Sequence, residues 1–310
     1  MENFRNHPLY RRHTFDSAMG AVWNFYKKNF LSLYLISLVM SLVLQYLTTS
    51  FLKTDQLQST TDLQEMIGIM QEMLVPMLLI SIVSLFFTTV LQYYILHKPV
   101  DENAGILASV IGGFKYFFPF LIIMILLAFF GTFAIVIGLL ALIIGALFVA
   151  VYLMTLYLFI LPVLMIEGSN IGNAISRSFK LTHKDFWANI GMAAVFLITI
   201  IVISMIISAI VMIPFSGSVL KSAFNPGETA TNDLLTSPFF LIFSAALSAL
   251  TLPLVPIFAC TLYFKARAEE EYEQNAGAKL EEYKPRVEDL YSGPTGSPDN
   301  TSIENNPEIK

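Results

Sequence analysis

Residues 116–166 read YFFPFLIIMILLAFFGTFAIVIGLLALIIGALFVAVYLMTLYLFILPVLMI, a stretch of 51 residues without a charged side chain. As one straight helix, this stretch would extend about 75 Å at about 1.5 Å per residue. The hydrocarbon core of a bilayer is only about 30 Å thick, and roughly 20 apolar residues cross it. The stretch therefore predicts two membrane spans, at 117–137 and 139–166, joined by a tight turn near Gly138.

The rest of the chain contains four more stretches that meet the same length criterion. Hydrophobic residues make up 55% of the 310 residues and charged residues only 13%, whereas a soluble domain carries about 25% charged residues. We therefore expect an all-α, polytopic membrane protein with six spans. The four further spans are predicted at 30–52, 73–96, 188–214 and 237–264, within a membrane domain over 14–267.

The distribution of Lys and Arg predicts the orientation. Sixteen of the 18 basic residues fall on one side of the predicted spans, and only Lys53 and Lys221 fall on the other. Because basic residues concentrate on the cytoplasmic side, we expect both termini, including segment 1–13, to be cytoplasmic. The tail 268–310 is acidic and rich in Pro, Ser, Asn and Gly from Pro285 onward, a composition typical of disorder.

A similar layout precedes three of the spans. The segments are DSAMGAVWNFYKKNF (16–30), GILASVIGGFKYFFPF (105–120) and IGNAISRSFKLTHKDFW (171–187). Each has apolar residues at helical spacing, followed by aromatic residues and lysine. This pattern predicts three amphipathic helices in the headgroup plane, each preceding a membrane hairpin, although aromatic residues and lysine at the ends of spans are also common without any repeat.

Few residues inside the spans could carry chemistry. The predicted spans contain no ionisable residue away from their ends, which disfavours proton- or ion-coupled transport. Gln92 in the second span and Pro253 and Pro256 in the sixth are the candidate intramembrane positions. They could contact a substrate beside a broken helix, or they could form an interhelical hydrogen bond and kink the helix.

No soluble catalytic constellation is recognisable in the sequence. The four histidines are scattered, and the single cysteine, Cys260, has no disulfide partner. Neither a phosphate-binding glycine loop nor a zinc-ligand motif occurs. We therefore expect a protein that is not an enzyme and that binds neither a metal nor a cofactor. The net charge of −5 and the absence of a basic stripe exclude a typical nucleic-acid-binding protein.

The stretch LPVLMIEGSNIGNAISRSFKLTHKDFW (161–187) contains the strongest candidate site. Glu167 stands where the fourth span ends, and the amphipathic segment after it carries Arg177, Lys180 and Lys184. These four residues could contact lipid phosphates or a protein partner, or they could simply anchor the helix at the interface.

The same stretch resembles the membrane domain of the glycerophosphoryl diester phosphodiesterase family and related uncharacterised multi-pass bacterial membrane proteins. LPLVPIFACTLYFKARAEEE (252–271) and TFDSAMGAVWNFYKKNFLSLYLI (14–36) resemble the closing and opening segments of that domain. In that family the phosphodiesterase chemistry belongs to a separate soluble barrel, whose residues this chain lacks. The resemblance therefore implies a location in a bacterial cytoplasmic membrane but no activity.

Three functions are compatible with these features. The first is a non-enzymatic protein that organises lipids or partner proteins through its cytoplasmic face or its acidic tail. The second is a transporter of an apolar or zwitterionic substrate. The third is an enzyme acting on lipid headgroups, for which Glu167, Arg177 and His183 are the candidate group. No feature of the sequence defines an oligomeric state.

Overall fold

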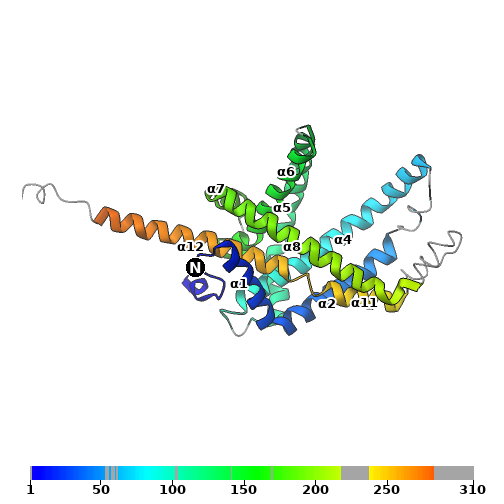
Figure 1. The fold of residues 1–310 in the computed structure, drawn as a ribbon, viewed down its shortest axis with the longest axis horizontal. Helices are drawn as coiled ribbons and strands as arrows, with labels where there is room; N and C mark the ends of the chain where they lie inside the picture. The colour runs from blue at the N-terminus through cyan, green and yellow to red at the C-terminus, as the bar shows by residue number, and fades with distance from the viewer. Residues whose placement is uncertain are drawn as a thin grey trace, which may run out of the picture. The chain divides into compact units, whose positions relative to one another are not determined.

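The computed structural model describes residues 2–52, 56, 60, 62–101, 104–140, 142–168, 170–217 and 237–282, and these residues contain helices but no strand. The chain divides into two compact units, Met1–Ala268 and Glu269–Lys310, and the core and the sites lie in the first. In chain order the helices (Figure 1) are η1 (Glu2–Asn6), α1 (Phe15–Lys28), α2 (Phe30–Phe51), α4 (Leu63–His97), α5 (Ile106–Leu140), α6 (Leu142–Ile166), α7 (Ile171–Lys184), α8 (Phe186–Met212), η2 (Ile213–Phe215), α11 (Pro238–Ser248) and α12 (Leu254–Glu282).

Five helices in the described part of the chain are long and apolar enough to cross a membrane, namely α2, α4, α5, α6 and α8. They correspond to the first five predicted spans. The largest difference is in α4, which begins at Leu63 rather than at residue 73, because the Asp62 side chain accepts a hydrogen bond from the Gln64 backbone N–H and caps the helix there. The chain is thus a multi-pass, all-α membrane protein.

The turn between α5 and α6 was predicted near Gly138, and this prediction is wrong by a few residues. Helix α5 continues to Leu140 and α6 begins at Leu142, so Gly138 lies inside α5 and not between the two helices. Residue 141 lies outside the described residues. Gly138 instead faces α6. A Cβ atom at this position would lie 3.0 Å from the Ala146 Cα atom, so the glycine permits the two helices to approach closely.

Two of the three predicted amphipathic segments form separate helices, α1 and α7. The second does not, because residues 106–140 form one continuous helix, α5. The residue at the junction of each amphipathic segment with its span explains why two of the segments end as separate helices and the third does not. Asn29 ends α1 and Asp185 ends α7, both outside helical backbone geometry, and such side chains compete with helical hydrogen bonds. The equivalent position before Phe117 is Tyr116, which has no such tendency, and the helix continues.

The sixth predicted span, 237–264, is not one helix. Helix α11 ends at Ser248, the chain makes tight turns through residues 249–253, and α12 starts at Leu254. Pro253 cannot donate a backbone hydrogen bond and disfavours helical geometry in the residue before it. Pro256 is tolerated because it lies in the first turn of α12, where backbone N–H groups have no helical partner. Helix α12 extends to Glu282, so the predicted tail is helical over 268–282, while 283–310 lie outside the described residues.

Tyrosines from α1 and α2 bind the backbone carbonyls near this break. The Tyr26 hydroxyl donates to the Leu250 carbonyl at 2.9 Å, and the Tyr34 hydroxyl donates to the Ala246 carbonyl at 3.3 Å. Carbonyls released from a helix inside a membrane protein need such partners, because hydrocarbon offers none. The interrupted helix is therefore held by contacts from the start of the chain.

The main buried core surrounds the first half of α12. Ile257, Phe258 and Cys260 are fully buried there, and the Phe258 ring stacks on Phe196 of α8 with centroids 3.9 Å apart. The core also includes the last turns of α4 and α6 and the inner faces of α1 and α7. By contrast, the far ends of α5 and α6 expose most of their large apolar side chains, as expected for surfaces that face lipid. The core therefore lies at the end of the bundle where α6 joins α7, and it positions the site there.

Candidate functional site

Glu167 follows the last residue of α6 at the point where the chain changes direction. Gly168 has a φ of +126°, a conformation that side-chain-bearing residues rarely adopt. The Asn170 side chain then accepts a hydrogen bond from the Asn173 backbone N–H and caps α7. The glycine and the cap together turn α7 so that its polar residues return to the end of α6.

The Glu167 carboxylate contacts side chains from two other helices. One oxygen, Oε2, accepts from Arg177 Nε of α7 at 2.8 Å. The other, Oε1, accepts from the Tyr263 hydroxyl of α12 at 3.0 Å and lies 3.7 Å from Arg267 Nε. Only 17% of the Glu167 side chain is exposed. A single partly buried carboxylate thus connects the end of α6 to both α7 and α12, and charge-assisted bonds of this kind are the stronger class.

A second ion pair connects the other end of α7 to α12. Lys265 Nζ lies 2.9 Å from Asp185 Oδ2, and the two side chains are 5% and 46% exposed. The Asn189 amide of α8 donates to the Leu181 carbonyl at 3.0 Å, close to the same junction. The junction of α7 and α8 is therefore fastened by polar contacts, as is the start of α7.

An open pocket of about 300 Å³ lies beside Glu167, and Arg177 and Lys180 contribute to its lining. Lys180 is exposed, whereas Arg177 is engaged by Glu167. Lys184 is also exposed, at the end of α7, but it does not line this pocket. Among the four residues predicted as interfacial contacts, the structure therefore places three around one pocket.

His183, the third member of the candidate enzymatic group, has other neighbours. Its Nδ1 lies 2.8 Å from the Phe179 carbonyl, and its Nε2 lies 3.5 Å from the Tyr152 hydroxyl. Within the described residues, no group of three or more His, Cys, Asp or Glu side chains could hold a metal ion. The chemistry that the Glu167 cluster supports directly is ion pairing and hydrogen bonding.

Tyr263, Lys265 and Arg267 were not among the predicted site residues. Tyr263 and Arg267 lie about one helical turn apart along α12, with Lys265 midway between them, and Tyr263 and Lys265 are still buried at the end of the predicted sixth span. The sequence LYFKAR, in which an aromatic residue precedes two basic residues, contains the only local signal of this role. Their partners lie 80 or more residues away in the chain. The spacing of residues along the sequence therefore could not predict which side chains they contact.

The predicted intramembrane position Gln92 forms an interhelical contact. Its side chain is buried, and Nε2 lies 2.7 Å from Cys260 Sγ of α12. Gln92 and Pro256 line a cavity of about 10 Å³, which is about the space that one water molecule occupies. Pro253 lies at the helix break and does not line this cavity.

The apolar helices, the reversal at Gly168 and the charged junction at one end of the bundle define a polytopic helical membrane domain. The family model for the membrane domain of glycerophosphoryl diester phosphodiesterase matches residues 128–289, more than half of the chain, and the protein belongs to this family. The matched region contains the Glu167 cluster in full. Comparison with curated proteins and with solved structures gives no match.

Proposed function

We propose that this protein is a non-enzymatic membrane component that organises anionic lipids or partner proteins at the cytoplasmic face, with both termini on that side. The observation that carries the proposal is the placement of α7. Its inner face, with Ala174, Ser178 and Leu181, is buried, while Lys180 and Lys184 are exposed. Amphipathic helices with lysine on the polar face bind anionic membrane surfaces.

The Glu167 cluster supports this role by holding α7 in place. Lys180 and Lys184, which are exposed, are the α7 residues that contact lipid phosphates in this proposal. Each basic residue near an anionic surface contributes about 1 kcal/mol. Two lysines on one fixed helix therefore enrich anionic lipid locally without requiring a catalytic group.

The test is to extract the protein in native lipid patches and to identify the copurifying lipids and proteins by mass spectrometry. We expect Lys180→Gln/Lys184→Gln to lower the anionic-lipid fraction or to release the protein partner. Lys115→Gln, together with Lys27→Gln, is a control that removes the same charge at other helices. An unchanged lipid and protein composition in the Lys180/Lys184 variant would contradict the proposal.

One observation favours transport as a second candidate function. The break between α11 and α12 resembles the discontinuous helices that form substrate sites in transporters. However, the cavity beside Gln92 measures only about 10 Å³, so a substrate could enter only if α4 and α12 separate. Cys260 is buried against Gln92 and provides a native reporter of such an opening.

Labelling of Cys260 by a small, water-soluble maleimide tests the transport function. If a transport cycle opens this region, the maleimide should label Cys260 in intact membranes, and Gln92→Leu should change the labelling rate. If Cys260 reacts only after denaturation, a substrate path through this region is excluded.

A further inference from the structure

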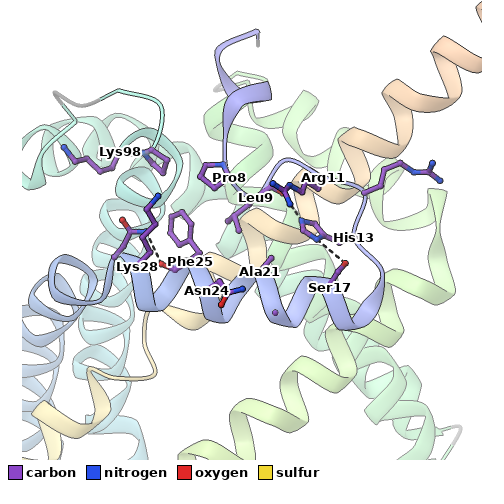
Figure 2. A pocket seen from close by; sticks show the side chains of 14 residues that line it. Pro8, Leu9, Arg11, His13, Ser17, Ala21, Asn24, Phe25, Lys28 and Lys98 are labelled. Atoms are coloured by element: carbon purple, nitrogen blue, oxygen red, sulfur yellow. Dashed lines mark hydrogen bonds between the residues drawn. The ribbon is translucent and has the colours of Figure 1, made fainter.

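A pocket of about 790 Å³ lies between α1 and the extended N-terminal segment, far in sequence from the Glu167 cluster. Figure 2 shows α1 on one side of the pocket and the segment with Pro8, Leu9 and Arg11 on the other, while Lys28 and Lys98 lie toward one end. This volume is typical of pockets for small organic molecules, which measure roughly 300–1,000 Å³.

The charge of the pocket wall is one-sided. Arg11, Arg12, Lys28 and Lys98 line it, and no Asp or Glu is found among the described residues of its lining. His13 also lines the pocket, but burial lowers the pKa of its imidazole, so it is uncharged at neutral pH. The lining therefore includes four basic side chains, around a space large enough for more than an inorganic ion.

The remaining wall provides hydrogen-bond donors and an apolar surface. Asn24 contributes an amide group, while the Ser17 hydroxyl donates to the Thr14 carbonyl and the Asn29 amide to the Phe25 carbonyl. Leu9 and Phe25 are buried apolar residues at the base. Guanidinium and ammonium groups bind phosphate oxygens by charge-assisted hydrogen bonds. A ligand with a phosphate group and a small organic portion fits both kinds of wall.

The base of the pocket is held in shape by contacts within the N-terminal segment. His7 Nε2 lies 3.1 Å from the Ile95 carbonyl of α4, and His13 Nε2 lies 3.1 Å from the Leu9 carbonyl. The His7 ring also lies over Phe25, with centroids 5.9 Å apart. The segment is thus docked on α1 and α4, and the cationic side chains project from a preformed framework.

From this arrangement, we infer that the pocket between the N-terminal segment and α1 binds an organic phosphate, either the phosphate headgroup of a membrane lipid or a soluble phosphate ester. The inference does not rest on the proposed role of α7, because none of the α7 residues lines this pocket. It assigns the protein a second anion-binding site, an open pocket whose volume suits a small organic molecule.

The experiment uses the full-length protein in nanodiscs of phosphatidylcholine. Ethyl phosphate, a soluble phosphate monoester, is titrated by calorimetry. In a second series, phosphatidic acid, a lipid with the same phosphate group, is added to the nanodiscs and its bound copies are counted by native mass spectrometry. Saturable binding of one equivalent of either compound supports the pocket, and the series in which it occurs identifies the source of the phosphate.

The matched variants are Lys28→Gln and Lys27→Gln, two neighbouring exposed lysines of α1. Only Lys28 lines the pocket, whereas Lys27 lies 5.7 Å from the Trp23 ring centroid. We expect Lys28→Gln combined with Arg11→Gln to weaken binding at least about tenfold, as the loss of charge-assisted contacts predicts. Lys28→Arg should retain binding, and Lys27→Gln should change it less than about twofold on the same scale.

Two results would overturn the inference. One is the absence of saturable binding of both probes to the unmodified protein. The other is an equal loss of affinity in Lys27→Gln and Lys28→Gln, which would show that only diffuse surface charge attracts the phosphate. The Lys180→Gln/Lys184→Gln variant should bind ethyl phosphate as the unmodified protein does, and it should keep the bound phosphatidic acid that Lys28→Gln combined with Arg11→Gln removes. Failure of the α7 proposal and failure of this one are therefore separable.

Discussion

Helices α1 and α7 have the same local design but are fastened to the bundle by different means. Each helix has 14 residues. Helix α1 ends with two lysines, and α7 ends with a histidine and a lysine. In both cases one polar residue separates the helix from the aromatic residue that begins the next span. Helix α7 is fixed by two ion pairs, Glu167 with Arg177 at the middle of the helix and Asp185 with Lys265 at its C-terminal cap. Helix α1 is fixed by a buried face with Val22 and by the docked N-terminal segment.

The difference shows which properties are local and which are not. The amphipathic pattern and the polar residue after it determine that a helix forms and where it ends. The contacts that hold the helix depend on how the chain folds back, over ten residues for Glu167 with Arg177 and over 80 or more for Asp185 with Lys265 and for Tyr26 with Leu250. The contacts are mainly ionic for α7, whereas those of α1 are mainly aromatic and apolar. Helix α7 should therefore respond to charge substitutions, whereas α1 should respond to the protonation of His7.

The largest effect is expected from Glu167→Gln. This change leaves Arg177 and Arg267 near each other without the carboxylate between them, and breaking a buried ion pair costs about 3 kcal/mol. The free energy of unfolding, measured by titration with denaturing detergent, should fall by about that amount. The exposed Asp16→Asn of α1 should change it by less than about 0.5 kcal/mol. A similar loss in both variants would contradict the contrast between the two helices.

An asymmetric effect is expected at the other end of α7. Asp185→Asn leaves the Lys265 ammonium, of which only 5% is exposed, without its carboxylate, and we expect a loss of about 2 kcal/mol. Lys265→Met leaves only the half-exposed Asp185, and the loss should stay below about 1 kcal/mol. The same detergent titration measures both. Equal losses, or a larger loss in Lys265→Met, would show that burial does not control this pair.

For α1 the expected perturbation is acidification. Burial, the largest cause, and the nearby His97 lower the pKa of His7 from 6.5 to about 4, partly offset by the hydrogen bond to Ile95. Below pH 6.5 the His7 imidazole binds a proton when the N-terminal segment is undocked but not when it is docked. The full stability of docking is therefore present above pH 6.5 and is lost as the pH falls toward 4. Between pH 7.5 and 5.5, we expect about 1 kcal/mol of weakening.

Amide hydrogen exchange of residues 4–10, followed from pH 7.5 to 5.5 and corrected for the intrinsic pH dependence, checks this expectation. His7→Phe removes the titrating group while retaining a ring over Phe25, and it should abolish the pH dependence. Residues 171–184 should not show a parallel change, because no buried histidine docks α7. An equal rise in exchange in residues 4–10 and in residues 171–184 would contradict the proposed difference between the docking of α1 and that of α7.

The smallest effect concerns the residue between α1 and α2. Asn29→Tyr places at this junction the residue type found at Tyr116, where the helix continues into the span. We expect a stability change of about 0.5 kcal/mol. Spin labels at the exposed positions Ser17 and Val39 should report a longer distance, because α1 and α2 become more nearly collinear. An unchanged distance would mean that packing, and not Asn29, ends α1.

Much of the fold follows from local sequence. Long apolar stretches predict α2, α4, α5, α6 and α8, because hydrocarbon requires helices of that length. The sequence left open whether Pro253 and Pro256 break the sixth span or kink it, because a proline either kinks or interrupts a helix depending on whether neighbours bind the released carbonyls. Here Tyr26 and Tyr34 bind them from more than 200 residues away.

The candidate site likewise contains residues that local sequence identified and residues that it did not. Glu167 and Arg177 were identified because an acidic residue at the end of a span precedes a basic amphipathic segment. Tyr263 and Arg267 were not, because their contacts with Glu167 depend on how α12 passes the end of α6. The pocket beside Arg11 and Lys28 was missed for a similar reason, since it requires the N-terminal segment to fold back onto α1 and α4.

The turn between α5 and α6 also has a consequence for how the protein is made. The whole hairpin, from Tyr116 to Ile166, carries no charge, and its far end exposes apolar residues such as Leu140 and Ile143. Moving a charged side chain into the centre of the membrane costs about 2.5–3.5 kcal/mol per residue during insertion. No such barrier opposes this hairpin, so both of its helices can enter the bilayer together as one unit. The early insertion of α5 and α6 would then provide the surface on which α7 and α12 assemble.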